Sequence, residues 1–164
     1  MSILLATVMV LGLKVNTMEQ VVDAIRTDQV RVGEVAQRPL SHEEIGNVDK
    51  TVQMKVGIGL PDEVKHFLTL VGGIDYNGAV IYGGAQSPDQ PGPGGFWQGI
   101  LAANLLWRNG ASLPFLVIGE TDMDILTVGV DGSNATLRDK VSHDVNERFH
   151  DVGTMITEVL RRRL

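Results

Sequence analysis

The hydrophobic positions of this chain predict helices in its first part and mostly strands in its last third. Two capping boxes, Thr17-x-x-Gln20 and Ser41-x-x-Glu44, each precede apolar residues at helical spacing and therefore indicate helix starts. The predicted helices cover residues 17–27, 41–52, 61–71, 96–108 and 149–160, and the predicted strands cover 79–82, 115–118, 125–130 and 135–137.

The third and fourth helices show the clearest patterns. Pro61 suits the first turn of a helix, and the apolar positions that follow it recur at i, i+3, i+4 and i+7, which makes one buried face. The same reasoning places four residues on one side of the fourth helix: Trp97, Ile100, Leu101 and Leu105.

A glycine-rich stretch, residues 72–84, joins the helical part to the first strand. Gly72-Gly73 has the form of a C-cap pair and predicts the end of the third helix. Asn77-Gly78 predicts a turn, because both residues tolerate positive φ. Residues 86–95 follow as a loop dense in Pro and Gly, which either carries function or is a plain surface insertion.

The element order predicts an α+β fold with an antiparallel meander in the last third. A length of 164 residues fits one domain and is too short for two comfortable ones. We expect residues 1–40 to be an N-terminal extension of a core that covers residues 41–164. The connection at residues 28–40 has no clear periodicity.

Charge and composition indicate the kind of partner and the location of the protein. The chain has 20 acidic and 14 basic residues, a net charge of −6, which disfavours nucleic acid and favours a basic protein partner. It contains no cysteine, which suits a cytoplasmic location. The apolar segment 3–13 is too short to span a bilayer, and we expect it to pack as part of the fold. A periplasmic location would follow if that segment acted as a leader.

No enzyme, cofactor or metal motif accompanies this pattern. The glycine-rich segments lack the spacing of a phosphate-binding loop, and no serine has a Gly-x-Ser-x-Gly setting. The four histidines do not have metal-ligand spacing. We therefore expect a protein without cofactor or metal.

Two groups of residues remain as candidates for binding a partner. The turn Glu120-Thr-Asp122-Met-Asp124 clusters three carboxylates, either as a solvated turn or as an acidic contact patch. Aromatic and polar residues around the central turn and the loop form the second group, because Tyr and Trp are favoured interface anchors, although a core role for them is equally compatible with the sequence. This second group comprises Asp75, Tyr76, Asn77 and Trp97.

The segment 60–82 resembles a known family. Leu60-Pro61, a helix, Gly-Ile-Asp-Tyr-Asn-Gly and Val-Ile-Tyr-Gly are similar to the YrhA-like branch of the SUKH superfamily, which includes Smi/Knr cell-wall regulators and bacterial immunity proteins. Residues 99–107 and 116–122 support the resemblance, which extends from about residue 41 to the C-terminus. It implies a bent, mostly antiparallel sheet with helices packed around it and a non-enzymatic role.

We hold three functional expectations, in decreasing order, of which the first two are implied by the resemblance. The first is an immunity protein that neutralises a secreted bacterial toxin by stoichiometric binding, in a type VI secretion or contact-dependent system. The second is a regulatory interaction domain of the Smi/Knr type. The third, which rests on the acidic turn alone, is a small hydrolase that uses Asp122 and Asp124. The binding face, the oligomeric state and the toxin are left open by the sequence.

Overall fold

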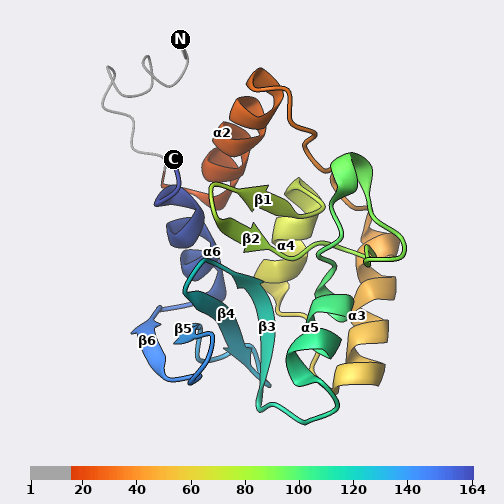
Figure 1. Cartoon of the computed structure of the whole chain (residues 1–164), viewed down its shortest axis with the longest axis vertical. Helices are drawn as coiled ribbons and strands as arrows, with labels where there is room; N and C mark the ends of the chain where they lie inside the picture. Colours follow the sequence, from red (N-terminus) through yellow and green to blue (C-terminus); the bar gives the residue numbers. More distant parts are fainter. Residues whose placement is uncertain (1–15) are drawn as a thin grey trace.

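The computed structural model describes residues 16–164, which form five α-helices around a six-stranded antiparallel sheet (Figure 1). The predicted α+β fold is confirmed. The expectation for the apolar segment 3–13 falls outside the described residues.

The sheet is a meander in which strand order follows chain order from β1 to β6. Its register is interrupted between Val117 and Gly119 and between Leu137 and Arg138, and such bulges bend a sheet. The strands are β1 (Ile74–Tyr76), β2 (Ala79–Ile81), β3 (Phe115–Glu120), β4 (Asp124–Gly129), β5 (Thr136–Asp139) and β6 (Val145–Arg148).

The helices bury their apolar faces against the sheet and against each other. Helix α2 packs on α6, α4 packs on α6, and α5 lies between β3 and α3 (Figure 1). Residues 18–25 of α2 share one hydrophobic core with the rest of the fold, so the described part of residues 1–40 is integral to that core. The helices are α2 (Met18–Arg31), α3 (His42–Val56), α4 (Asp62–Leu70), α5 (Ile100–Arg108) and α6 (Val152–Arg161), with a 3₁₀ turn η1 (Pro93–Gly95).

Of the two predicted capping boxes, the first forms completely and the second only in part. Thr17 forms the complete box, because its hydroxyl accepts from the Gln20 amide while the Gln20 side chain accepts from the Thr17 amide. Ser41 accepts from the Glu44 amide at 3.1 Å, but the Glu44 carboxylate is paired with Arg38 at 3.0 Å. The second box is therefore only half formed, and Ser41 alone caps α3.

The prediction that Gly72-Gly73 is a helix C-cap was wrong. Helix α4 ends at Leu70, and its C-cap is Val71 in an extended conformation. The glycines serve close packing instead: a Cβ on Gly73, which has φ +133°, would lie 2.5 Å from the Phe96 ring. A Cβ on Gly83 would lie 2.1 Å from the Gly72 carbonyl oxygen. These glycines thus let the start of β1, the end of β2 and Phe96 approach one another.

The predicted helix 96–108 was wrong at its start and in its buried face. Helix α5 begins at Ile100, and Trp97 lies in the preceding loop. Leu105 and Leu106 are 44% and 61% exposed, whereas Asn104 and Arg108 are buried. An apolar-periodicity argument misses this face because two of its four buried residues are polar.

The polar residues of α5 fasten it to β3. Asn104 Nδ2 donates to the carbonyls of Ile100 and Val117, and Asn104 Oδ1 accepts from the Val117 amide at 2.9 Å and from Arg108 at 2.7 Å. Arg108 also donates to the Phe115 carbonyl at 2.7 Å. Its guanidinium is thus held by neutral oxygens, and burial lowers its pKa.

Two strands were missed by the sequence prediction, and the bounds of α2, α3 and α6 differ from the predicted ones, with α3 ending at Val56, four residues beyond its predicted end. Asn77 and Gly78, with φ of +46° and +82°, form the predicted turn, but it closes a hairpin whose first strand is β1. Strand β6 was not predicted because its residues alternate between half-buried and exposed and include charges. Helix α2 extends four residues beyond its predicted end, and α6 begins three residues after its predicted start.

Candidate partner-binding site

A polar pocket of about 540 Å³ lies where the end of α2, strand β1 and the loop before α5 meet. It contains three of the predicted binding residues, Asp75, Asn77 and Trp97, and adds Glu34. We call it the acidic pocket. Its lining residues are Gln29, Gly33, Glu34, Val35, Gln37, Gly73, Asp75, Asn77, Pro93, Gly94, Gly95, Phe96, Trp97 and Gln98.

Asp75 is presented by the first hairpin. It is the register partner of Val80, which in turn is the partner of Glu120, so the three residues lie on one side of the sheet. Asp75 is exposed as a residue, but atoms packed around its carboxyl exclude water and raise its pKa. Gln98 lowers this pKa by hydrogen bonding and the Glu120 charge raises it further. The Asp75 carboxylate is therefore poorly compensated.

Replacing Asp75 by Asn should stabilise the protein at neutral pH. A raised carboxyl pKa in the folded state means that Asp75 opposes folding once it ionises, and that this cost is absent below its unfolded pKa of 3.8. The Asp75→Asn variant should therefore have a higher midpoint of urea unfolding at pH 7, with the advantage disappearing as the pH falls below about 4. A variant that is equally or less stable at pH 7 would contradict this assignment.

Trp97 connects the acidic pocket to a neighbouring cavity. Its side chain is 38% exposed, and both Trp97 and Gln98 also line a cavity of about 270 Å³ with Tyr82, Leu106, Trp107 and Glu120. Trp107 Nε1 donates to the Tyr82 hydroxyl at 2.8 Å, which fixes the aromatic wall of this cavity. We call the residues that line these two cavities the Asp75–Trp97 face.

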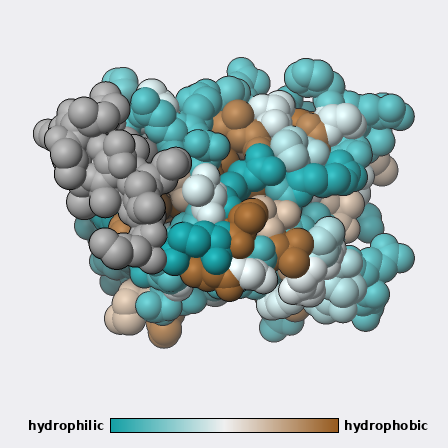
Figure 2. Space-filling model, turned by 90° about the horizontal axis from the view of Figure 1, so that it is seen from above, coloured by the Kyte–Doolittle hydropathy of each residue, from teal (hydrophilic) through white to brown (hydrophobic). Residues whose placement is uncertain are grey.

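Exposed apolar side chains lie at the end of α2 and beyond it, and one of them is part of this face. Val30, Val32 and Val35 at the end of α2 and beyond it are 67%, 52% and 52% exposed, and Val35 lines the acidic pocket. Figure 2, which views the molecule from above, shows separate apolar areas among hydrophilic residues. A mixed surface of this kind is typical of non-obligate protein interfaces.

The remaining predicted residues near the hairpin have structural partners. Asn77 Nδ2 donates to the Arg163 carbonyl at 3.1 Å, and Arg163 donates to the Asn77 carbonyl at 3.1 Å. Tyr76 is buried, and its hydroxyl donates to Asp28 at 2.7 Å. Burial, followed by this hydrogen bond, raises the pKa of Tyr76 to about 12. Tyr76 therefore supports the hairpin from inside the fold.

The three carboxylates of the predicted acidic turn are directed to different partners. Glu120 pairs with Lys140 at 2.9 Å, and Asp124 accepts from Asn146 at 2.7 Å. Asp122 is exposed and lies beside the Gly78 turn. Of these three carboxylates, only that of Glu120 belongs to the Asp75–Trp97 face. The cluster seen in the sequence is thus distributed over separate places in the fold.

The C-terminal arginines are engaged within the protein. Arg161 pairs with Glu158 at 2.6 Å, and Arg162 pairs with Glu147 at 2.6 Å. Arg163 holds the hairpin turn, as described above. The basic C-terminus is thus tied to α6, β6 and the hairpin turn.

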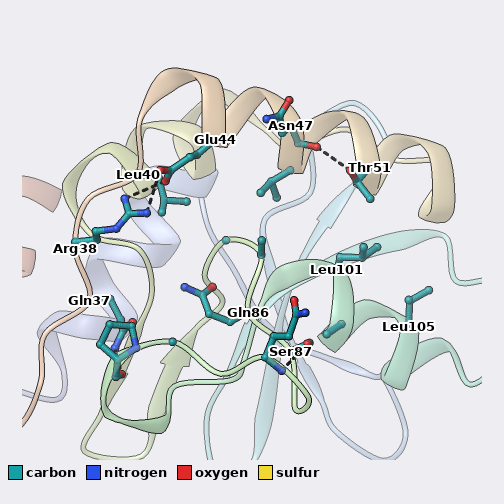
Figure 3. Close-up of a pocket in the computed structure, with 17 residues that line it drawn as sticks. Gln37, Arg38, Leu40, Glu44, Asn47, Thr51, Gln86, Ser87, Leu101 and Leu105 are labelled. Atoms are coloured by element: carbon teal, nitrogen blue, oxygen red, sulfur yellow. Dashed lines mark hydrogen bonds and ion pairs between the residues drawn. The ribbon is translucent and has the colours of Figure 1, made fainter.

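A second, more apolar groove of about 760 Å³ lies between α3, α5 and the loop 84–93 (Figure 3). Figure 3 shows Gln86 between the α3 and α5 sides, with Leu101 and Leu105 coming from α5 and the Arg38–Glu44 pair at one end. The Oε1 atom of Gln86 is buried and has no hydrogen-bond partner among residues 16–164. The Pro/Gly loop predicted from the sequence forms one wall of this groove.

Gln37 holds that loop and separates the groove from the acidic pocket. It is 5% exposed, it lines both cavities, and its Nε2 donates to the Pro93 carbonyl at 2.8 Å. Replacing Gln37 by Ala should destabilise the protein by about 1–2 kcal/mol, because the buried Gln37 side chain and its hydrogen bond to the Pro93 carbonyl are both lost. Hydrogen exchange of the Gly92 and Gly94–Phe96 amides should accelerate while exchange in β3 and β4 changes little. Equal acceleration throughout would contradict a local role.

The residues that complete the acidic pocket were missed from the sequence. Gln29 and Glu34 lie in the segment 28–40, which the hydrophobic pattern leaves undefined, and Gln98 lies in the part of the predicted helix 96–108 that is a loop in the structure. They meet Asp75 only because α2 and the loop before α5 both end beside β1. No local signal in the sequence identifies such a meeting.

The described chain offers little beyond these cavities as a site. Within residues 16–164, no group of three or more His, Asp or Glu side chains is placed to hold a metal ion. None of the helices in the described part of the chain is long and apolar enough to cross a membrane. Comparison with known protein families finds no matching family, and comparison with curated proteins finds no relative.

Proposed function

We propose that this protein binds a partner protein through the Asp75–Trp97 face, as the immunity protein of a secreted bacterial toxin. The observation that carries the proposal is the acidic pocket, in which a poorly compensated carboxylate, Asp75, lies beside a half-exposed Trp97. Acidic groups favour a basic partner, and a tryptophan at the centre of a face is a common anchor.

The mode of action follows from the same face. Its carboxylates and aromatic groups suit occlusion of a basic surface on the toxin, and binding at one such face gives a one-to-one complex. The resemblance of residues 60–82 to the YrhA-like SUKH proteins supports the assignment to immunity. A regulatory interaction domain of the Smi/Knr type remains the alternative, because it would use a binding face in the same way.

Co-expression tests this proposal. The protein should restore growth of cells that produce the toxin encoded by the adjacent upstream gene, and it should co-purify with that toxin at a one-to-one ratio. Rescue without a complex would instead indicate an enzyme that reverses the damage. Absence of both rescue and complex would contradict the immunity role and favour the regulatory alternative.

A further inference from the structure

The acidic pocket is lined by two carboxylates. They belong to Glu34 and Asp75, and among residues 16–164 its lining contains no Lys, Arg or His. The nearby cations are engaged within the protein: Arg31 pairs with Asp28 at 2.6 Å, Lys140 pairs with Glu120 at 2.9 Å, and Arg163 donates to the Asn77 carbonyl at 3.1 Å. The two pocket carboxylates are therefore available to a cation from outside the protein.

A buried side chain at this pocket also lacks a hydrogen-bond donor. Gln29 is only 6% exposed and lines the pocket. Its Nε2 donates to the Asp75 carbonyl at 3.3 Å, while its Oε1 has no partner among the described residues. An unpaired buried acceptor is unfavourable, and because this oxygen lies beneath the pocket surface, a ligand's donor would reach it only if the Gln29 side chain turned toward the pocket.

The aromatic residues of the pocket complete its chemistry. Trp97, which is 38% exposed, and Phe96, which is 7% exposed, both line it. The face of a tryptophan attracts a cation, and a planar guanidinium stacks on it better than an ammonium group does. The pocket thus combines carboxylates, an amide acceptor and an aromatic surface.

We infer that the acidic pocket receives an arginine side chain of the partner protein, with the guanidinium placed between Asp75, Glu34 and Trp97. Arginine fits better than lysine because its five N–H donors in a planar fork can reach several separate acceptors at once. This inference rests on the proposed function for the identity of the partner, but the pocket itself can be tested without one.

The test uses N-acetyl-arginine methylamide as the probe and follows the protein by NMR. Titration should shift the indole N–H signal of Trp97 and the side-chain amide signals of Gln29 and Gln98, with a dissociation constant of about 1–10 mM. The lysine analogue should bind at least about fivefold more weakly. The Asp75→Asn and Glu34→Gln variants should each weaken arginine binding about tenfold.

Asp23→Asn is the matched control. Asp23 is an exposed carboxylate of α2 with no side-chain hydrogen bond or ion pair among residues 16–164, so its replacement makes the same charge change away from the pocket. This variant should bind the arginine probe like the parent protein. The comparison separates local recognition from the overall net charge.

The outcomes for the pocket and for the proposed function are distinct. No shift with the arginine probe, equal binding of the lysine analogue, or equal losses in Asp75→Asn and Asp23→Asn would each overturn the assignment, even if the protein neutralised a toxin. Selective arginine binding that requires Asp75 would support the assignment, even if co-expression with the adjacent toxin gave no rescue.

Discussion

Replacing Asn104 by Leu is expected to lower the free energy of unfolding by about 3–5 kcal/mol. Asn104 is fully buried and makes four hydrogen bonds, two of them to the backbone of Val117. Leucine fills a similar volume, so the loss would come from unpaired polar groups rather than from a cavity. The largest part should come from Arg108, whose buried charge would lose one of its two oxygen partners.

A double-mutant cycle isolates that part. Arg108→Met removes the buried charge, so Asn104→Leu should cost clearly less in the Arg108→Met background than alone, and the two changes should not be additive. Asn47→Leu, at an exposed position of α3, is the control and should change stability by less than about 0.5 kcal/mol. Urea unfolding measures the stability of the four proteins of the cycle and of the control. Additive changes would show that Asn104 and Arg108 do not act as one unit.

Replacing Asp75 by Arg is expected to weaken the complex with the toxin about 100-fold or more, because a cation then faces the cation of the partner. Asp75 lies on an exposed position of β1, so the variant should still fold. Calorimetric titration gives the affinity, and growth rescue at low expression gives the consequence in cells. Asp23→Arg makes the same charge change on α2, and this variant should still bind the toxin and restore growth. Equal losses in both variants would place the binding face elsewhere.

Asp75 is expected to have opposite effects on stability and on binding. The Asp75→Asn variant should be more stable than the parent protein at pH 7, while the same carboxylate is required for binding. Residues kept at the expense of stability are characteristic of functional sites. Replacing a residue that has only a structural role would instead lower the stability of the protein.

Local signals predicted the helices and turns well. The Thr17 capping box, the apolar face of α4 and the Asn77-Gly78 turn each depend on residues close together in the chain, and the structure confirms them. Such features are set by local hydrogen bonds and backbone conformation, which neighbouring residues determine.

Features that depend on distant contacts were predicted poorly. The double glycines were interpreted as a helix end, but their role is to admit Phe96 and a neighbouring backbone segment from later in the chain. The buried face of α5 was misassigned because Asn104 and Arg108 are satisfied by the backbone of β3. A polar residue is buried only when partners are brought to it, and the sequence does not show which partners arrive.

In the candidate site, too, the features set by nearby residues were predicted and those set by distant contacts were not. Asp75 and Trp97 were predicted from their residue types and their places beside the turn and the loop, and the structure brings them to one pocket with Asn77. Gln29 comes from α2, 46 residues before Asp75 in the chain, and Glu34 comes from the segment that follows α2. Tyr76 alternates with Asp75 on β1, and this alternation places it in the core.

Inhibition of the purified toxin by increasing amounts of this protein tests the central claim most directly. We predict that toxin activity falls linearly and ends at one equivalent of protein, and that the Asp75→Arg variant leaves the toxin active at that ratio. Protection by much less than one equivalent, or an active toxin in the presence of excess protein, would contradict neutralisation by stoichiometric binding.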